Sequence, residues 1–172
     1  MIQKKICLLG GFGVGKTSLV AQFVHSIFSD KYLTTVGVKI DRKSVDVDRD
    51  RVDLVIWDIY GHDDFQKMRV SYLRGASGYL LVADGTRAAT LATAVELQHL
   101  AQQTLGDVPF ILAVNKADLR DEWQIGDTAL DALAGGGWRV MKTSAKTGEM
   151  VEGAFASLGR AMLAPARKTG HE

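Results

Sequence analysis

The feature that most constrains this chain is a glycine-rich segment near its amino terminus. Residues 10–17 read GGFGVGKT, directly after the apolar run 6–9 and before a stretch with helical character. This matches the pattern G-x-x-x-x-G-K-[ST], in which backbone N–H groups and a helix N-terminus surround phosphate oxygens. Lys16 would neutralise phosphate charge, and the Thr17 hydroxyl would bind magnesium. The predicted phosphate contacts are Gly11, Phe12, Gly13, Val14, Gly15, Lys16, Thr17 and Ser18.

The phosphate pattern alone does not separate ATP from GTP, but two later motifs do. NKAD at 115–118 follows an apolar run, and SAK at 144–146 follows the last strand-like run. The Asp118 carboxylate can accept two hydrogen bonds from guanine, whereas adenine offers no such pair of donors. The stems of Lys116 and Lys146 can pack on the base faces, and the Ala145 N–H can donate to the guanine carbonyl. The predicted base contacts are Asn115, Lys116, Asp118, Ser144, Ala145 and Lys146.

The order of elements predicts an α/β fold. Candidate strands lie at residues 4–9, 36–47, 52–57, 78–83, 109–114 and 138–141, and helical spacing fills most of the intervals. This alternation predicts a mostly parallel six-stranded sheet with helices on both faces. The polar tip at 48–51 is too short for a crossover helix, so we expect one antiparallel edge strand. Ligands of such sheets bind at the carboxyl ends of the parallel strands, where both motifs lie.

Length and composition are those of one ordinary globular domain. The chain has 172 residues, of which 47% are hydrophobic and 24% charged. We expect a single domain over 1–172 with its core at 4–163, a flexible connection at 132–137 and a flexible tail at 164–172. A net charge of +1 gives no reason to expect nucleic acid.

The single cysteine and the lack of a recognisable targeting signal favour a cytoplasmic protein. We also expect a monomer. The lone cysteine, Cys7, cannot form an intrachain disulfide, and it lies in an apolar run. No stretch reaches the length of a membrane span. The first residues lack the pattern of a secretory leader, and we expect no lipid anchor in this chain.

Taken together, these motifs resemble a Ras/Rab-type small GTPase of the P-loop superfamily, from Lys4 to Leu163. Rab-like segments are YLTTVGV at 32–38, VIWD at 55–58 and YLRGASG at 72–78. The resemblance implies a G domain that binds GDP or GTP with magnesium and changes the shape of two loops. It also implies that Thr35 contacts magnesium and the γ-phosphate, and that Phe28 packs near the sugar and base.

The same resemblance identifies the second of the two loops that change shape, the first being the loop that contains Thr35. DIYG at 58–61 matches the family pattern D-x-x-G. The resemblance implies that Asp58 holds a magnesium-bound water and that the Gly61 N–H meets the γ-phosphate, so that loss of this phosphate releases both loops. The implied metal ligands are Thr17, Thr35 and, through water, Asp58. The implied catalytic residues are Lys16, Thr35, Gly61 and His62.

Three residues depart from the Ras/Rab pattern. Phe12 replaces a glycine, and its ring would project into the space that an inserted arginine finger uses, so we expect it to exclude a Ras-type activating protein. His62 replaces the glutamine that orients the attacking water. A histidine can do the same, as in elongation-factor GTPases; the alternative is an exposed loop residue and very slow hydrolysis. Tyr60 replaces an alanine and either shields the γ-phosphate or recruits a partner.

The expected function is a GDP/GTP-dependent switch with slow hydrolysis, on the order of 10⁻⁴ to 10⁻² s⁻¹. Its expected partners are an effector, an exchange factor and an activating protein at the two switches, and no nucleic acid. Two alternatives stay open: a hydrolysis-deficient scaffold that binds guanine nucleotide, and a GTPase domain excised from a larger signalling protein. Asp118 argues against a P-loop ATPase or small-molecule kinase.

Overall fold

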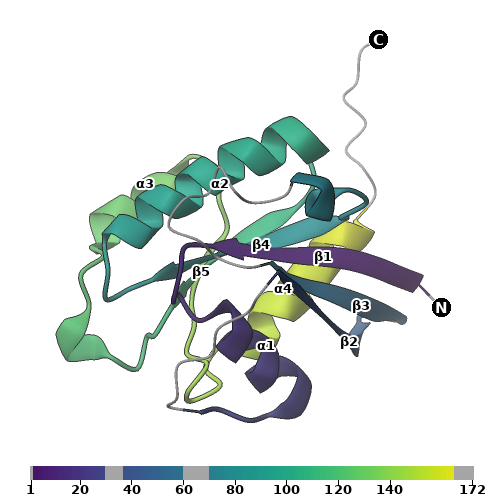
Figure 1. Ribbon diagram of the computed structural model, residues 1–172, viewed down its shortest axis with the longest axis horizontal. Helices are drawn as coiled ribbons and strands as arrows, with labels where there is room; N and C mark the ends of the chain where they lie inside the picture. Colours follow the sequence, from purple (N-terminus) through teal and green to yellow (C-terminus); the bar gives the residue numbers. More distant parts are fainter. Residues whose placement is uncertain (1, 30–36, 60–69, 165–172) are drawn as a thin grey trace.

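The computed structural model describes residues 2–29, 37–59 and 70–164 of the chain. Within these ranges the elements alternate between strands and helices, with short 3-10 turns η2 and η3 between some of them (Figure 1). In order they are β1 (Ile2–Gly10), α1 (Lys16–His25), β2 (Val38–Val47), β3 (Asp50–Ile59), η2 (Val70–Leu73), β4 (Gly78–Asp84), α2 (Ala89–Leu105), β5 (Phe110–Asn115), η3 (Arg120–Glu122), α3 (Asp127–Gly135), β6 (Val140–Lys142) and α4 (Val151–Leu163).

The strands form one six-stranded sheet in the order β2-β3-β1-β4-β5-β6. Among the strands of the described residues, only the pair β2 and β3 is antiparallel, and β2 lies at the edge. Its turn is tight because Asp48 adopts the left-handed conformation, with φ of 54°. The prediction of a mostly parallel sheet with one antiparallel edge strand is confirmed.

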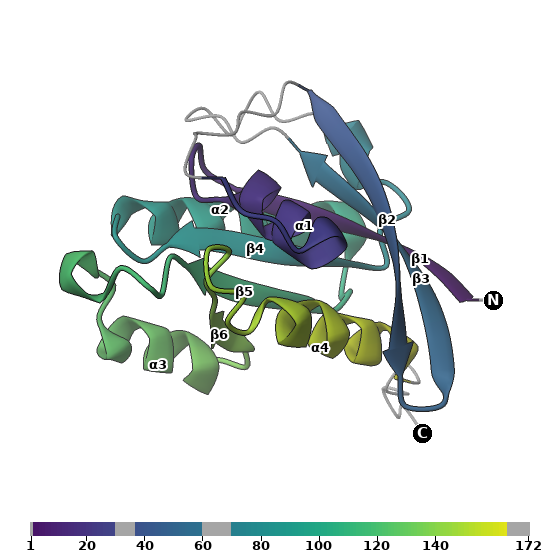
Figure 2. The same cartoon turned by 90° about the horizontal axis from the view of Figure 1, so that it is seen from below.

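Helices cover both faces of the sheet, as predicted. Figure 2 shows α1 and α4 together on one face, while α2 and α3 lie on the other. Phe23 of α1 stacks on Phe155 of α4, with ring centroids 4.0 Å apart. On the second face, α2 packs against the sheet through small and aliphatic side chains such as Ala94 and Leu97. Among the described residues, no helix has the length and apolar character that crossing a membrane requires.

The glycine-rich segment 132–137 differs from its prediction. Residues up to Gly135 belong to α3, so the expected flexible connection is wrong for its first part. The helix ends because Gly137 takes a φ of 96°, which lets the Trp138 N–H bond back to the Leu133 carbonyl at 3.0 Å. Of the predicted tail, only residue 164 lies within the described residues.

Candidate nucleotide-binding site

The predicted phosphate loop at 10–17, which connects β1 to α1, is closely packed. Gly15 has a φ of 101°, and a Cβ built on it would lie 2.3 Å from Asn115 Nδ2. Val14 is fully buried in the core beneath the loop, so it anchors the turn. Since no acidic residue occupies the first turn of α1, the positive end of the helix dipole points into the loop without a counter-charge on the helix. This geometry suits an anion.

Lys16 places a buried cation within that loop. Only 6% of the residue is exposed, and its amine donates to the carbonyl oxygens of Gly10 and Gly11 at 3.2 and 3.4 Å. Burial lowers the pKa of the Lys16 amine to about 8, and the nearby Asp58 charge opposes this shift. Phosphate oxygens would give the ammonium ion a stronger partner than two carbonyls.

Thr17 and Asp58 meet beside Lys16. The Thr17 hydroxyl donates to Asp58 Oδ2 at 2.6 Å, and Asp58 is fully buried near the end of β3. A hydroxyl and a carboxylate are the hard oxygen donors that Mg²⁺ prefers. The pair therefore fits the predicted ion, to which Thr17 would be a direct ligand and Asp58 would bind through water. A magnesium ion there would neutralise charge on the phosphate oxygens.

Asn115 joins the predicted loops. It belongs to residues 115–118, which are predicted to read the base and are called the base-reading loop below, and it contacts the phosphate loop. Its side-chain amide donates to the Val14 carbonyl at 3.1 Å. Its carbonyl oxygen accepts bonds from the Thr143 hydroxyl and the Ala145 N–H, at 3.2 and 3.3 Å. The Ala145 N–H, predicted to donate to guanine, thus makes a long hydrogen bond within the protein. One buried side chain joins three loops.

Asp118 is oriented by its neighbour in the second motif. The Ser144 hydroxyl donates to Asp118 Oδ1 at 2.7 Å, and Ser144 Oγ in turn accepts the Thr147 N–H at 3.1 Å. This fixes one oxygen of a half-buried carboxylate at the carboxyl edge of the sheet. Lys146, two residues after Ser144, is exposed.

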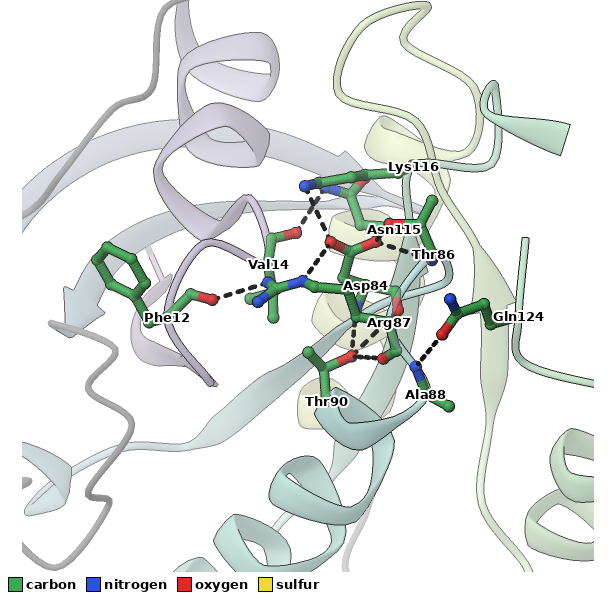
Figure 3. A network of polar contacts seen from close by, with 10 residues as sticks. All are labelled: Phe12, Val14, Asp84, Thr86, Arg87, Ala88, Thr90, Asn115, Lys116 and Gln124. Atoms are coloured by element: carbon green, nitrogen blue, oxygen red, sulfur yellow. Dashed lines mark hydrogen bonds and ion pairs between the residues drawn. The ribbon is translucent and has the colours of Figure 1, made fainter. Parts of the chain in front are cut away.

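Two aromatic side chains of the predicted site are exposed. Phe12 is 37% exposed and Phe28 is 40% exposed. Figure 3 shows the Phe12 ring turned away from the polar groups that its own carbonyl contacts. Both side chains therefore reach the surface of the described part of the chain.

The structure also reveals a carboxylate that the sequence motifs do not include. Asp84, at the end of β4, forms ion pairs with Lys116 at 2.9 Å and with Arg87 at 3.0 Å (Figure 3). Burial opposes ionisation most strongly, but hydrogen bonds from Thr86, Lys116 and Arg87 outweigh it, so the pKa of Asp84 is lowered. Its position at the carboxyl end of a central parallel strand is a signal that could have identified it.

The structure does not describe most of the predicted switch residues. Thr35, Tyr60, Gly61 and His62 lie outside the described residues. Apart from Phe28, which follows α1, the remaining predicted contacts lie at the carboxyl ends of β1, β3, β5 and β6 or directly after them, and these ends share one edge of the sheet. That edge can hold phosphates at one end and a base at the other.

Comparison with known proteins identifies the family. The Ras family model matches residues 5–164. "GTP-binding protein yptV2" of Volvox carteri is 36% identical over 93% of this chain and 75% of its own length. "Ras-related protein Rab-13" of Bos taurus is 32% identical over 92% of this chain and 79% of its own, and "Ras-related protein Rab-8B" of Homo sapiens is 30% identical over 92% and 78%. The chain therefore belongs to the Ras family of small GTPases, switch proteins that bind GTP or GDP with magnesium and hydrolyse GTP.

Proposed function

We propose that this chain is a self-resetting switch, which binds GTP with magnesium at this edge of the sheet and hydrolyses it slowly. One observation carries the proposal. The buried Lys16 amine lies beside the Thr17–Asp58 oxygen pair in the phosphate loop, and that loop is bonded through Asn115 to the loop of Asp118. A triphosphate and a guanine base would thus be held by one connected framework.

The phosphate end would be bound by backbone N–H groups and by Lys16. The backbone from Gly11 to Ser18 would surround the phosphate oxygens, while Lys16 neutralises their charge. Thr17, Thr35 and Asp58 are the proposed magnesium ligands, the last through water. When GTP is bound, Thr35 and the Gly61 N–H would hold the γ-phosphate, and its loss would free both switch loops.

The base end would be read by Asp118. Its carboxylate would accept two hydrogen bonds from guanine, and its hydrogen bond from Ser144 supports that orientation. The stems of Lys116 and Lys146 would pack on the base, the Ala145 N–H would reach its carbonyl oxygen, and Phe28 would pack near the sugar.

Hydrolysis would depend on His62 to orient the attacking water. The exposed Phe12 side chain supports exclusion of an arginine finger, so we expect the intrinsic reaction to matter more than activation in trans. The proposed partners at the switches are an effector and an exchange factor. We further propose that the chain acts in the cytoplasm as a monomer.

Single-turnover GTP hydrolysis with magnesium tests this proposal. The native chain should turn over on the order of 10⁻⁴ to 10⁻² s⁻¹, and His62→Ala should fall at least about tenfold with unchanged nucleotide affinity. Adding a Ras-type activating protein should stimulate the reaction little, whereas strong stimulation would contradict the role of Phe12. Tight GTP binding without any hydrolysis would instead support the scaffold alternative.

A further inference from the structure

We propose that Asp84 and Arg87 tie the phosphate loop to the base-reading loop and thereby slow the release of bound nucleotide. We call this pair the Asp84–Arg87 clamp. Neither residue belongs to the proposed nucleotide contacts, so both act as positioning residues. The inference rests on the proposed nucleotide site.

Asp84 is the centre of the clamp. Only 1% of its side chain is exposed, yet it carries four polar contacts. Its Oδ2 atom lies 2.9 Å from Lys116 Nζ and 3.0 Å from Arg87 Nε. Its Oδ1 atom accepts the N–H and the hydroxyl of Thr86, at 2.9 and 2.6 Å. A buried carboxylate with two cations and two neutral donors is held in one position, because moving it away from them would leave charge unpaired in the interior.

Arg87 extends the clamp to the phosphate loop. Its Nε contacts Asp84, while its Nη2 donates to the Phe12 carbonyl at 2.8 Å (Figure 3). The planar guanidinium fork presents these two donors in one fixed geometry, whereas an ammonium would have to reach both groups from a single nitrogen on a flexible stem. Since the Phe12 backbone is part of the loop that would surround the phosphates, Arg87 restrains that loop from outside.

Lys116 extends the clamp to the other end of the nucleotide. Its backbone is in the left-handed conformation, with φ of 69°, and its amine is fixed at Asp84. The aliphatic stem is the part proposed to pack on the base. A single carboxylate therefore sets the position of a base contact and, through Arg87, of the phosphate loop.

The turn between β4 and α2 gives the clamp a rigid base. The Thr90 hydroxyl accepts the Asp84 N–H at 2.8 Å and donates to the Arg87 carbonyl at 2.7 Å. The Ala88 N–H donates to Gln124 Oε1 at 3.1 Å. Because this turn cannot shift easily, movement of either nucleotide-binding loop would have to break a contact to it.

The effect on nucleotide release should be moderate. Asn115 also joins the two loops, through its bond to the Val14 carbonyl, and that bond persists without Arg87. Arg87→Ala removes the hydrogen bond to Phe12 and one ion pair of a half-exposed side chain. We expect GDP to dissociate about threefold to tenfold faster, the effect of one or two such contacts.

The test measures dissociation of a fluorescent GDP analogue from the native chain and three variants. Arg87→Ala should release it faster. Arg87→Lys, which retains the charge beside Asp84 but not the fork, should also release it faster while its thermal unfolding stays near that of the native chain. Arg160→Ala is the control, since Arg160 pairs with Asp48 outside this network at 3.8 Å, and it should release GDP at the native rate.

A double-mutant cycle adds a readout that a purely structural role would not move. Each single variant, Arg87→Ala and Lys116→Ala, gives a fold-change in the dissociation rate of GDP. If Asp84 links Arg87 to Lys116, the product of these two fold-changes should exceed the fold-change of the double variant. Native-rate release from both Arg87 variants, or strictly multiplicative effects, would overturn the clamp. Failure of the native chain to bind GDP at all would instead overturn the proposed function.

Discussion

At the scale of single residues, burial decides what each polar group can do. Lys16 and Asp84 are both buried and ionisable, but their partners differ. Lys16 has two carbonyl oxygens, and burial lowers its pKa to about 8. Asp84 has two cations and both the hydroxyl and the N–H of Thr86, and together these outweigh the cost of burial, so that its pKa is lowered. A phosphate would supply Lys16 with the counter-charge that Asp84 already has.

This difference predicts pH-dependent binding of GDP. Phosphate oxygens would raise the pKa of Lys16, so binding at a pH above about 8 must take up a proton. Below that pH the amine is already charged and takes up none. The association constant should therefore fall about fourfold from pH 7.0 to 8.5.

Calorimetry in two buffers with different ionisation enthalpies would count the proton directly. We expect proton uptake at pH 8.5 and almost none at pH 7.0. Equal affinity and no uptake at both values would show that Lys16 does not meet the phosphates.

At the scale of elements, the first residue after β4, Gly85, is buried and closely packed. A Cβ built on Gly85 would lie 1.9 Å from the Trp123 ring, which covers this glycine from the segment after η3. The Gly85 carbonyl also accepts the N–H groups of Gln124 and Ile125, at 2.7 and 3.2 Å. The carboxyl end of β4, which carries Asp84, is thus fixed to a neighbouring segment.

Gly85→Ala should consequently destabilise the chain. The added methyl group would displace the Trp123 ring, at a cost of about 1 to 3 kcal/mol in the free energy of unfolding. Gly135→Ala is the matched control, because that glycine lies in α3 with open space around it and should be neutral or stabilising. Urea denaturation monitored by circular dichroism compares the two. Equal stability of both variants would mean that the Trp123 ring moves away freely.

Element boundaries show what sequence reasoning could and could not give. The strands were predictable because β-rich apolar runs alternate with helical spacing. The segment 132–137 was not, because three consecutive glycines suggest flexibility although only Gly137 uses a positive φ. The Asp84–Arg87 clamp was missed because no local motif encodes it: Phe12 and Lys116 meet it only after β1, β4 and β5 pair.

At the scale of the whole molecule, the site is a consequence of the sheet. Parallel strands bring their carboxyl ends to one edge, so motifs separated by about a hundred residues meet there. The Asn115 side chain bonds to the Val14 carbonyl across that sequence distance. The motifs at 10–17, 115–118 and 144–146 could therefore be assigned to one site from sequence alone, whereas the roles of Thr35, Tyr60 and His62 remain predictions.

The central claim is that this edge binds a guanine nucleotide through Asp118. The most direct test is to measure the affinity of the native chain and of Asp118→Asn for GDP and for xanthosine diphosphate. Guanine offers two donors to a carboxylate, whereas xanthine carries a carbonyl oxygen that suits the amide of asparagine. We predict that the variant loses at least about tenfold in GDP affinity and gains affinity for the xanthine nucleotide. Unchanged GDP affinity in the variant would contradict the account.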